Sequence, residues 1–125
     1  MINVPASIGE LIDKITVLKI KSIEITDADK LKNITKEYDV LTALPEFINV
    51  QEKFAKHLKD LLTVNYKIWF GGEDIRRLEN DNNIGEEYLE TSRMIFKMND
   101  KRSKIKKEIN ILCNSELIEE KSYKD

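Results

Sequence analysis

The chain has 125 residues and a formal net charge of −2, with 41% hydrophobic and 35% charged residues. This length predicts one domain over residues 1–125, with a core that needs no metal or disulfide to hold it together. The composition excludes a disordered chain, and the small net charge excludes a strong overall attraction to nucleic acid or to an anionic membrane.

The first predicted element is a helix that begins after Ser7. Ser7 and Glu10 have the spacing of a capping box, in which the hydroxyl accepts from the Glu10 amide and the carboxylate reaches back. One face then carries apolar residues at helical spacing: Ile8, Leu11, Ile12, Ile15 and Leu18. The helix is expected to end shortly before Asp27.

A second helix is predicted to follow a break that lies within two residues of Asp27. Thr26 and Asp29 form a cap-like pair at its start. Its apolar residues make a narrow seam, which is typical of a helical hairpin: Leu31, Ile34, Tyr38 and Leu41.

The third predicted helix begins near Pro45, because a proline in the first turn gives up an N–H that has no partner there. Its core face also includes Asn65, and the apolar residues of that face are Phe47, Phe54, Leu58, Leu61, Leu62, Ile68 and Trp69. The glycine pair 71–72 is expected to stop or kink the helix. A short helix over 73–81 and a loop over 80–85 are predicted to follow.

The last predicted helix, from about residue 85 to about residue 113, has an interrupted core face. Ile95 and Phe96 begin an apolar stripe that Ile105 and Ile109 resume, and six polar residues, 99–104, lie between them. Steps of three and four give this seam: Ser92, Ile95, Asn99, Arg102, Lys106, Ile109 and Leu112. The sequence therefore places polar side chains where a core is expected.

The pattern predicts an all-α fold. No segment alternates convincingly with period two, so fewer than a tenth of the residues are expected in strands. We predict a compact bundle of two antiparallel helical hairpins with a short linking helix.

Two asparagines are predicted on core seams, Asn65 in the third helix and Asn99 in the last. One interpretation is a register device, because a buried polar residue costs stability but excludes shifted packings. A second is an interface in which a partner covers the polar patch. A third is a pocket for an anionic or polar small molecule, lined by Asn65, Trp69, Arg93, Asn99 and Arg102. We predict that both asparagine side chains are mostly buried and hydrogen-bonded.

Three segments occur in order along the chain: "SIGELIDKITVLKIKSIEI", "NDKRSKIKKEIN" and "SELIEEKSY". Over residues 5–123 the chain resembles a bacterial and phage family of uncharacterised proteins, a domain of unknown function numbered 6165. The resemblance implies a compact all-helical domain and no established activity. It also implies a polar motif at Glu10, Asp13, Lys14, Trp69, Asn99, Asp100, Arg102, Glu108, Asn110 and the tail residues Glu119, Glu120, Lys121, Ser122 and Tyr123. The glycine pair 71–72 departs from the acidic or apolar residues of the family pattern.

The polar tail is predicted to fold back after a turn at residues 114–115. Leu117 and Ile118 would dock on the core, and Glu119 or Glu120 would meet a cation near the polar centre. Docking the aliphatic pair would contribute about 3–5 kcal/mol before ordering entropy. Exposed ion pairs would add less than about 1 kcal/mol, so the aliphatic pair should dominate.

No catalytic constellation is expected. His57 is the only histidine and Cys113 the only cysteine, which argues against the usual zinc sites. We expect His57 at the surface or its boundary, and Cys113 as a small buried hydrophobe at the end of the last helix. The acidic segments 86–90 and 10–13 resemble the halves of a magnesium motif in all-helical nucleotide pyrophosphatases, but in reversed order. No metal or cofactor is therefore predicted.

Two further classes of partner are disfavoured. The basic run between Lys97 and Lys107 has no interleaved aromatic residues and is diluted by Asp100 and Glu108, which argues against nucleic acid. The chain shows no signal-peptide pattern and no apolar run approaching the roughly 20 residues of a membrane span. Together with the lone cysteine, this predicts a cytoplasmic protein without a membrane partner.

The sequence leaves two functions open. The first is a small non-catalytic binding or assembly domain that either self-associates or binds another protein. The alternative is a small-molecule binding protein or enzyme, with an anionic metabolite held around Asn65, Asn99 and Arg102. An exposed apolar patch would favour the first, and a concave pocket with perturbed titratable groups the second.

Overall fold

The computed structural model describes residues 1–113, which form five helices and no strand. The helices are α1 (Ile8–Glu24), α2 (Ala28–Thr42), α3 (Pro45–Ile48), α4 (Ala55–Asn80) and α5 (Glu86–Leu112). The all-α prediction is confirmed. The predicted turn and docking of the tail lie outside the described residues.

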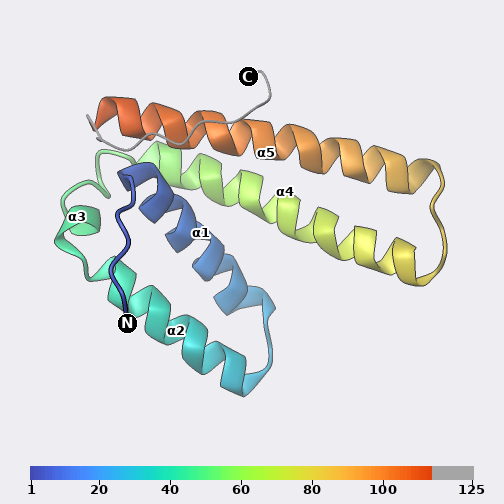
Figure 1. Cartoon of the computed structure of the whole chain (residues 1–125), viewed down its shortest axis with the longest axis horizontal. Helices are drawn as coiled ribbons and strands as arrows, with labels where there is room; N and C mark the ends of the chain where they lie inside the picture. Colours follow the sequence, from blue (N-terminus) through green and yellow to red (C-terminus); the bar gives the residue numbers. More distant parts are fainter. Residues whose placement is uncertain (114–125) are drawn as a thin grey trace.

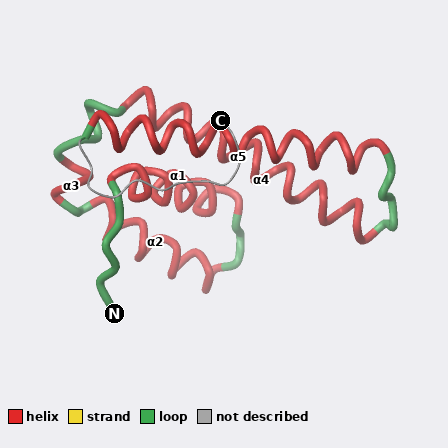
Figure 2. Tube along the Cα trace, turned by 45° about the horizontal axis from the view of Figure 1, so that its top comes forward, coloured by secondary structure: helices red, strands yellow, loops and turns green. Residues whose placement is uncertain are grey.

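Two helical hairpins make up the fold (Figure 1). Helices α1 and α2 form the first, α4 and α5 form the second, and α1 packs against both helices of the second. The short helix α3 links the hairpins and also contacts α1 and α2. Both views show α4 and α5 running side by side and extending beyond α1 and α2 (Figures 1 and 2). Among the described residues, no helix is long and apolar enough to cross a membrane.

The first hairpin begins and turns where side chains cap its helices. The Ser7 hydroxyl oxygen accepts from the Glu10 amide at 3.1 Å, as predicted. α1 ends at Glu24 and α2 begins at Ala28, so the predicted break is confirmed. The cap of α2 is Asp27 itself, whose Oδ1 accepts from the Lys30 amide at 2.9 Å. The predicted Thr26 and Asp29 pair is wrong, because the break lies one residue later and makes Asp27 the flanking residue.

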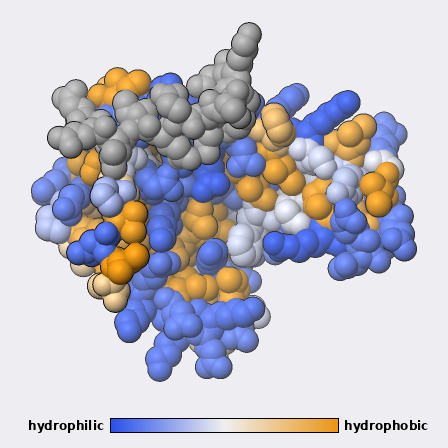
Figure 3. All heavy atoms as spheres, in the orientation of Figure 1, coloured by the Kyte–Doolittle hydropathy of each residue, from blue (hydrophilic) through white to orange (hydrophobic). Residues whose placement is uncertain are grey.

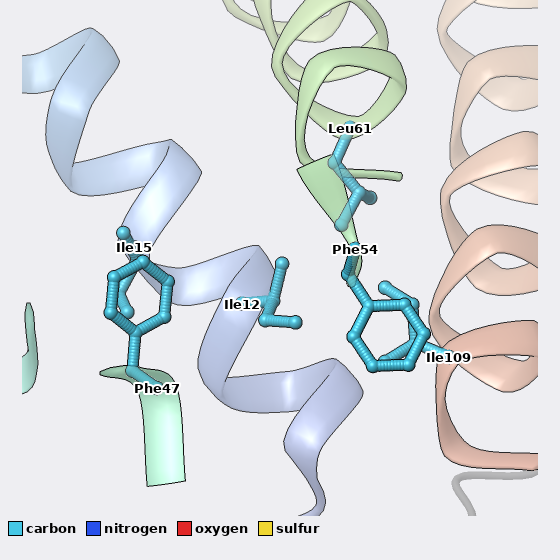
Figure 4. Packing of buried hydrophobic residues seen from close by; sticks show 6 residues of the cluster. All are labelled: Ile12, Ile15, Phe47, Phe54, Leu61 and Ile109. Carbon is cyan, nitrogen blue, oxygen red and sulfur yellow. The ribbon is translucent and has the colours of Figure 1, made fainter. Parts of the chain in front are cut away.

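The segment after Pro45 is not one long helix. The helix that begins there ends at Ile48, and turns lead to α4, which begins at Ala55. Phe47 and Phe54 both belong to the buried core. In the view of Figure 4, Phe47 lies on one side of Ile12 and Phe54 on the other. The chain turns between the two rings because they fill opposite ends of the same core. The short linking helix is therefore Pro45–Ile48.

The glycine pair 71–72 does not interrupt α4, which runs unbroken from Ala55 to Asn80. The predicted stop and the separate short helix over 73–81 are therefore wrong. Gly71 is buried against α5, where a Cβ would lie 2.8 Å from side-chain atoms of both Met94 and Ile95. Close packing on α5 and the complete burial of Leu78 hold the helix together across the glycines.

The main core lies where α1, α3, α4 and α5 meet (Figure 4). Its buried members are Ile12, Ile15, Phe47, Phe54, Leu61 and Ile109. Each of these side chains contributes about 1.5–3 kcal/mol when taken out of water. This core secures the end of the α4–α5 hairpin that carries α1, and the polar residues considered next lie beside it.

Candidate functional site

A buried carboxylate lies at the centre of the contact between α1 and the second hairpin. Asp13 is 1% exposed. Arg102 of α5 donates from Nε to Oδ1 at 2.9 Å and to Oδ2 at 3.1 Å, and its Nη2 donates to Oδ2. This is a charge-assisted pair with two guanidinium nitrogens on one carboxylate, which fixes the relative position of α1 and α5.

Asn65 of α4 joins the same carboxylate. Its Nδ2 donates to Asp13 Oδ1 at 2.9 Å and to the Thr16 hydroxyl oxygen at 2.8 Å. The Thr16 hydroxyl in turn donates to the Asp13 carbonyl at 2.7 Å. Asn65 is 4% exposed, so its predicted burial and hydrogen bonding are confirmed.

A second cation balances a second carboxylate next to Asp13. Lys106 is buried, and its Nζ lies 2.7 Å from Glu10 Oε2 and 4.0 Å from Asp13 Oδ2. The Glu10 carboxylate, which was predicted to reach back to the start of α1, pairs with Lys106 of α5 instead, while the Glu10 amide takes part in the cap as predicted. Arg102 and Lys106 offset the charge of buried Asp13, and Glu10 offsets that of buried Lys106, which lowers the cost of burying the two charges.

Asn110 ties the start of α1 to α5. Its Oδ1 accepts from the Gly9 amide at 2.7 Å, which satisfies one of the amides that a helix leaves unpaired in its first turn. Gly9 is required for this contact, because a Cβ at that position would lie 2.5 Å from the Lys106 carbonyl oxygen. We call the whole set the Asp13 cluster: Glu10, Asp13, Thr16, Asn65, Arg102, Lys106 and Asn110.

The cluster explains the polar interruption in α5. Arg102 and Lys106 face a buried acid of α1, whereas Ile109 one turn later is fully buried in the apolar core. Asn99, also predicted for this centre, is half-buried. Within residues 1–113, no hydrogen bond joins its side chain to Asp13 or Asn65. The structure therefore brings Asn65 and Arg102 together through Asp13 and leaves Asn99 outside the cluster.

The other predicted site residues are dispersed. Trp69 is half-buried, with an indole N–H that has no partner among residues 1–113. Arg93 is exposed on α5. Lys14 is exposed, and its Nζ lies 3.5 Å from Oε2 of Glu37 in α2. Asp100 is half-buried, and its buried Oδ1 likewise has no hydrogen-bond partner within residues 1–113. Glu119, Glu120 and Tyr123 lie outside the described residues.

The two side chains with the greatest chemical reactivity, those of His57 and Cys113, both pack against core residues. His57 is half-buried, its Nε2 lies 3.2 Å from Glu108 Oε1, and its ring meets the Phe54 ring edge-on at 5.3 Å. Cys113 is half-buried at the end of α5 and packs against the core. Burial raises the pKa of the Cys113 thiol, and Lys53 lowers it by a smaller amount. A thiol with a raised pKa is a poor nucleophile at neutral pH.

The sequence analysis missed Thr16 and did not identify Asp13 as the centre of the polar contacts. A signal was present, because Gly9, Asp13 and Thr16 follow one another at steps of four and three. Such a stripe of small and polar residues beside an apolar face is typical of a helix that buries two sides. All three residues are buried.

A small cavity borders the Asp13 cluster. It has a volume of about 180 Å³ and opens between α1, α2 and α5. Cationic and anionic side chains line it in equal number: Lys14, Lys21, Arg102, Glu10, Asp13 and Glu37. The balanced charges suit a small polar molecule more than a strongly charged one.

The two acidic segments weighed as a magnesium motif are not brought together. Residues 86–90 begin α5 at the far end of the second hairpin, whereas residues 10–13 lie in α1 at its other end (Figure 1). In residues 1–113, no three side chains of His, Cys, Asp or Glu gather closely enough to hold a metal ion.

Comparisons with known proteins add a family. No curated protein and no solved structure matches the chain. One family model matches residues 2–125 and therefore almost the entire chain. The chain belongs to the family of unknown function DUF6165.

Proposed function

We propose that this chain is a non-catalytic binding or assembly domain that docks its partner on the projecting part of the second hairpin. We call residues 70–96 the arm. The Asp13 cluster and the core hold α1 against the opposite end of α4 and α5, so the arm extends from a base that is packed on α1. The Asp13 carboxylate accepts hydrogen bonds from both Asn65 and Arg102, which supports a structural role for these two residues.

The observation that carries the proposal is the exposure of large apolar side chains on the arm. Phe70 is 46%, Leu89 50% and Ile84 63% exposed. On the face seen in Figure 3, apolar side chains stand out among charged ones along the arm. A helical layer normally buries its apolar residues against another element. Among residues 1–113, α1 is the only helix that packs against the second hairpin, at its base, and no helix covers the arm (Figure 1).

Photo-crosslinking in cells tests this function. A benzoylphenylalanine in place of Phe70 should give covalent adducts of defined mass, because the probe would lie in the docking surface. The matched control is the same probe in place of Ile48, which is 50% exposed but lies on α3. Equal adduct formation at the two positions would show that the arm is no special contact surface, and the proposal would fail.

The cavity beside the Asp13 cluster supports a second candidate, the recognition of a small polar or anionic molecule. Arg102 is the one predicted ligand-binding residue in the lining of this cavity. Two further cations, Lys14 and Lys21, also line it. Glycine and serine, small zwitterions whose opposite charges match the mixed lining, are suitable probes in a thermal-shift titration. This candidate requires a melting temperature that rises with probe concentration for the wild type and rises much less for Lys21→Ala. Equal shifts in both proteins would exclude the cavity.

A further inference from the structure

We propose that the partner is a second copy of this chain, which docks antiparallel on the arm and on the adjoining part of the same hairpin, through the face that turns away from α1. This inference rests on the function proposed above and names the occupant of its docking surface. It follows from three observations. These are a basic groove on that face, an acidic tip on the same hairpin, and the residues at which α4 and α5 lie level with each other.

The groove consists of two adjoining hollows that share Met98. The first, of about 410 Å³, is lined from α4 by Asp60, Thr63, Val64 and Lys67, and from α5 by Met98, Lys101, Lys104 and Ile105. The second, of about 320 Å³, lies nearer the tip and is lined by Glu90, Arg93, Met94, Lys97 and Met98. Five cationic side chains thus surround the apolar residues of the two hollows, and two acidic side chains, Asp60 and Glu90, also line them. We call this the basic groove.

The basic groove lies on the opposite side of α5 from the Asp13 cluster. Successive residues of a helix are separated by about 100° around its axis. Lys101 therefore stands about 100° from Arg102, and Lys104 about 200° from Lys106. Because Arg102 and Lys106 point at α1, the lysines of the groove point away from it.

The tip of the hairpin carries the opposite charge. Residues 73–90 contain seven acidic residues and two arginines. One of these, Arg77, pairs with Glu87 at 3.1 Å and with Asp74 at 3.7 Å. Residues 91–107 contain seven basic residues and one acid. The same hairpin is therefore acidic towards its tip and basic towards its base, and a copy turned end over end matches it in charge.

The positions of the charges match a two-fold axis across the hairpin. In an antiparallel pair of α5 helices, residues whose numbers have a constant sum face each other. Glu86 then faces Lys101 of the other copy, and Glu90 faces its Lys97. All four residues are exposed and lie on one face of α5. The axis crosses α5 between Arg93 and Met94.

Helix α4 gives the same axis independently. Pairing Lys67 with Asp74 of the other copy places the axis between Phe70 and Gly71, and brings the two Phe70 rings close to it. Within one chain, Gly71 packs against Met94 and Ile95, so this point of α4 lies level with residues 94–95 of α5. The two helices therefore agree on one axis, as a closed isologous dimer requires. Arg93 of each copy meets its mate near the axis and has Glu90 one turn away on its own helix.

The available area is of the right order. Residues 86–104 of α5 span about 27 Å, and two helices side by side are about 20 Å wide. The flat area of this face is therefore about 540 Å², and protruding side chains add to it. A stable interface of standard size takes about 800 Å² from each partner. The apolar floor supplies methionines, which adapt to an opposing surface.

Charge reversal tests the dimer. The first variant is Lys97→Glu/Lys101→Glu and the second is Glu86→Lys/Glu90→Lys. Each alone places like charges opposite one another, so its dimer dissociation constant should rise by about tenfold or more. An equimolar mixture restores every pair and should form a heterodimer. Lys32→Glu/Lys36→Glu at exposed positions of α2 is the control for the first variant, because it lowers the net charge by the same amount and leaves the proposed interface unchanged.

Light scattering during size exclusion measures the outcome. The wild type, the control and the mixture should approach twice the 14.6 kDa of one chain as concentration rises, while each reversed variant lags behind. A wild type that remains at one chain mass at every concentration would overturn the proposal, as would a mixture that stays monomeric. If the probe at Phe70 then crosslinked a different protein, the proposed binding function would stand with another partner. A failure of the arm crosslinks as well would remove both proposals.

Discussion

Replacing Asp13 by alanine is expected to lower the free energy of unfolding by about 3–5 kcal/mol. The substitution removes the carboxylate that Arg102 and Asn65 contact and that lies 4.0 Å from Lys106 Nζ. Breaking a buried ion pair removes the attraction that offset the desolvation cost of the remaining charge. Denaturant unfolding monitored by circular dichroism measures this loss from the midpoint and the slope.

Two further variants identify the source of the loss. Asp39→Ala removes an exposed carboxylate on α2 and should change stability by no more than about 0.5 kcal/mol. Asp13→Leu/Arg102→Met should be more stable than Asp13→Ala, because no buried charge is left unpaired in that pair. If Asp13→Ala unfolds at the same denaturant concentration as Asp39→Ala, the cluster does not hold α1 in place.

Gly9→Ala is expected to destabilise the fold by about 2–3 kcal/mol, although alanine favours helices. A Cβ at Gly9 would lie 2.5 Å from the Lys106 carbonyl oxygen and 2.8 Å from Asn110 Oδ1. The obstacle includes backbone, so α1 and α5 must separate and the Asn110 hydrogen bond must lengthen. Helix propensity returns only about 1 kcal/mol, so the steric term should dominate. Thermal and denaturant unfolding both report the change.

The matched control for Gly9 is Gly72→Ala. Gly72 also lies within a helix, but a Cβ there would meet nothing within 4 Å. The substitution should therefore stabilise the protein by about 0.5–1 kcal/mol through helix propensity alone. The two glycine substitutions should thus have opposite signs. If both stabilise the protein, the close approach of α1 to α5 is not required for folding.

The sequence alone was sufficient for the features that depend on local chemistry. The hydroxyl of Ser7 starts α1, the break near Asp27 separates the first hairpin, and Pro45 begins a helix, because capping and proline effects act within one turn. Helical spacing also placed Asn65 on a buried face. These inferences need only the positions of neighbouring residues.

Only the tertiary structure decided the rest. The glycine pair 71–72 has a helix-breaking composition, but packing of Gly71 on Met94 and Ile95 keeps α4 continuous. The polar residues of α5 suggested a centre that includes Asn99. The register of α1 on α5 instead selects Arg102 and Lys106 as partners of Asp13. Residues that are 89 positions apart in the chain meet there, and a hydrogen bond over that separation depends on how the helices pack, which no local pattern encodes.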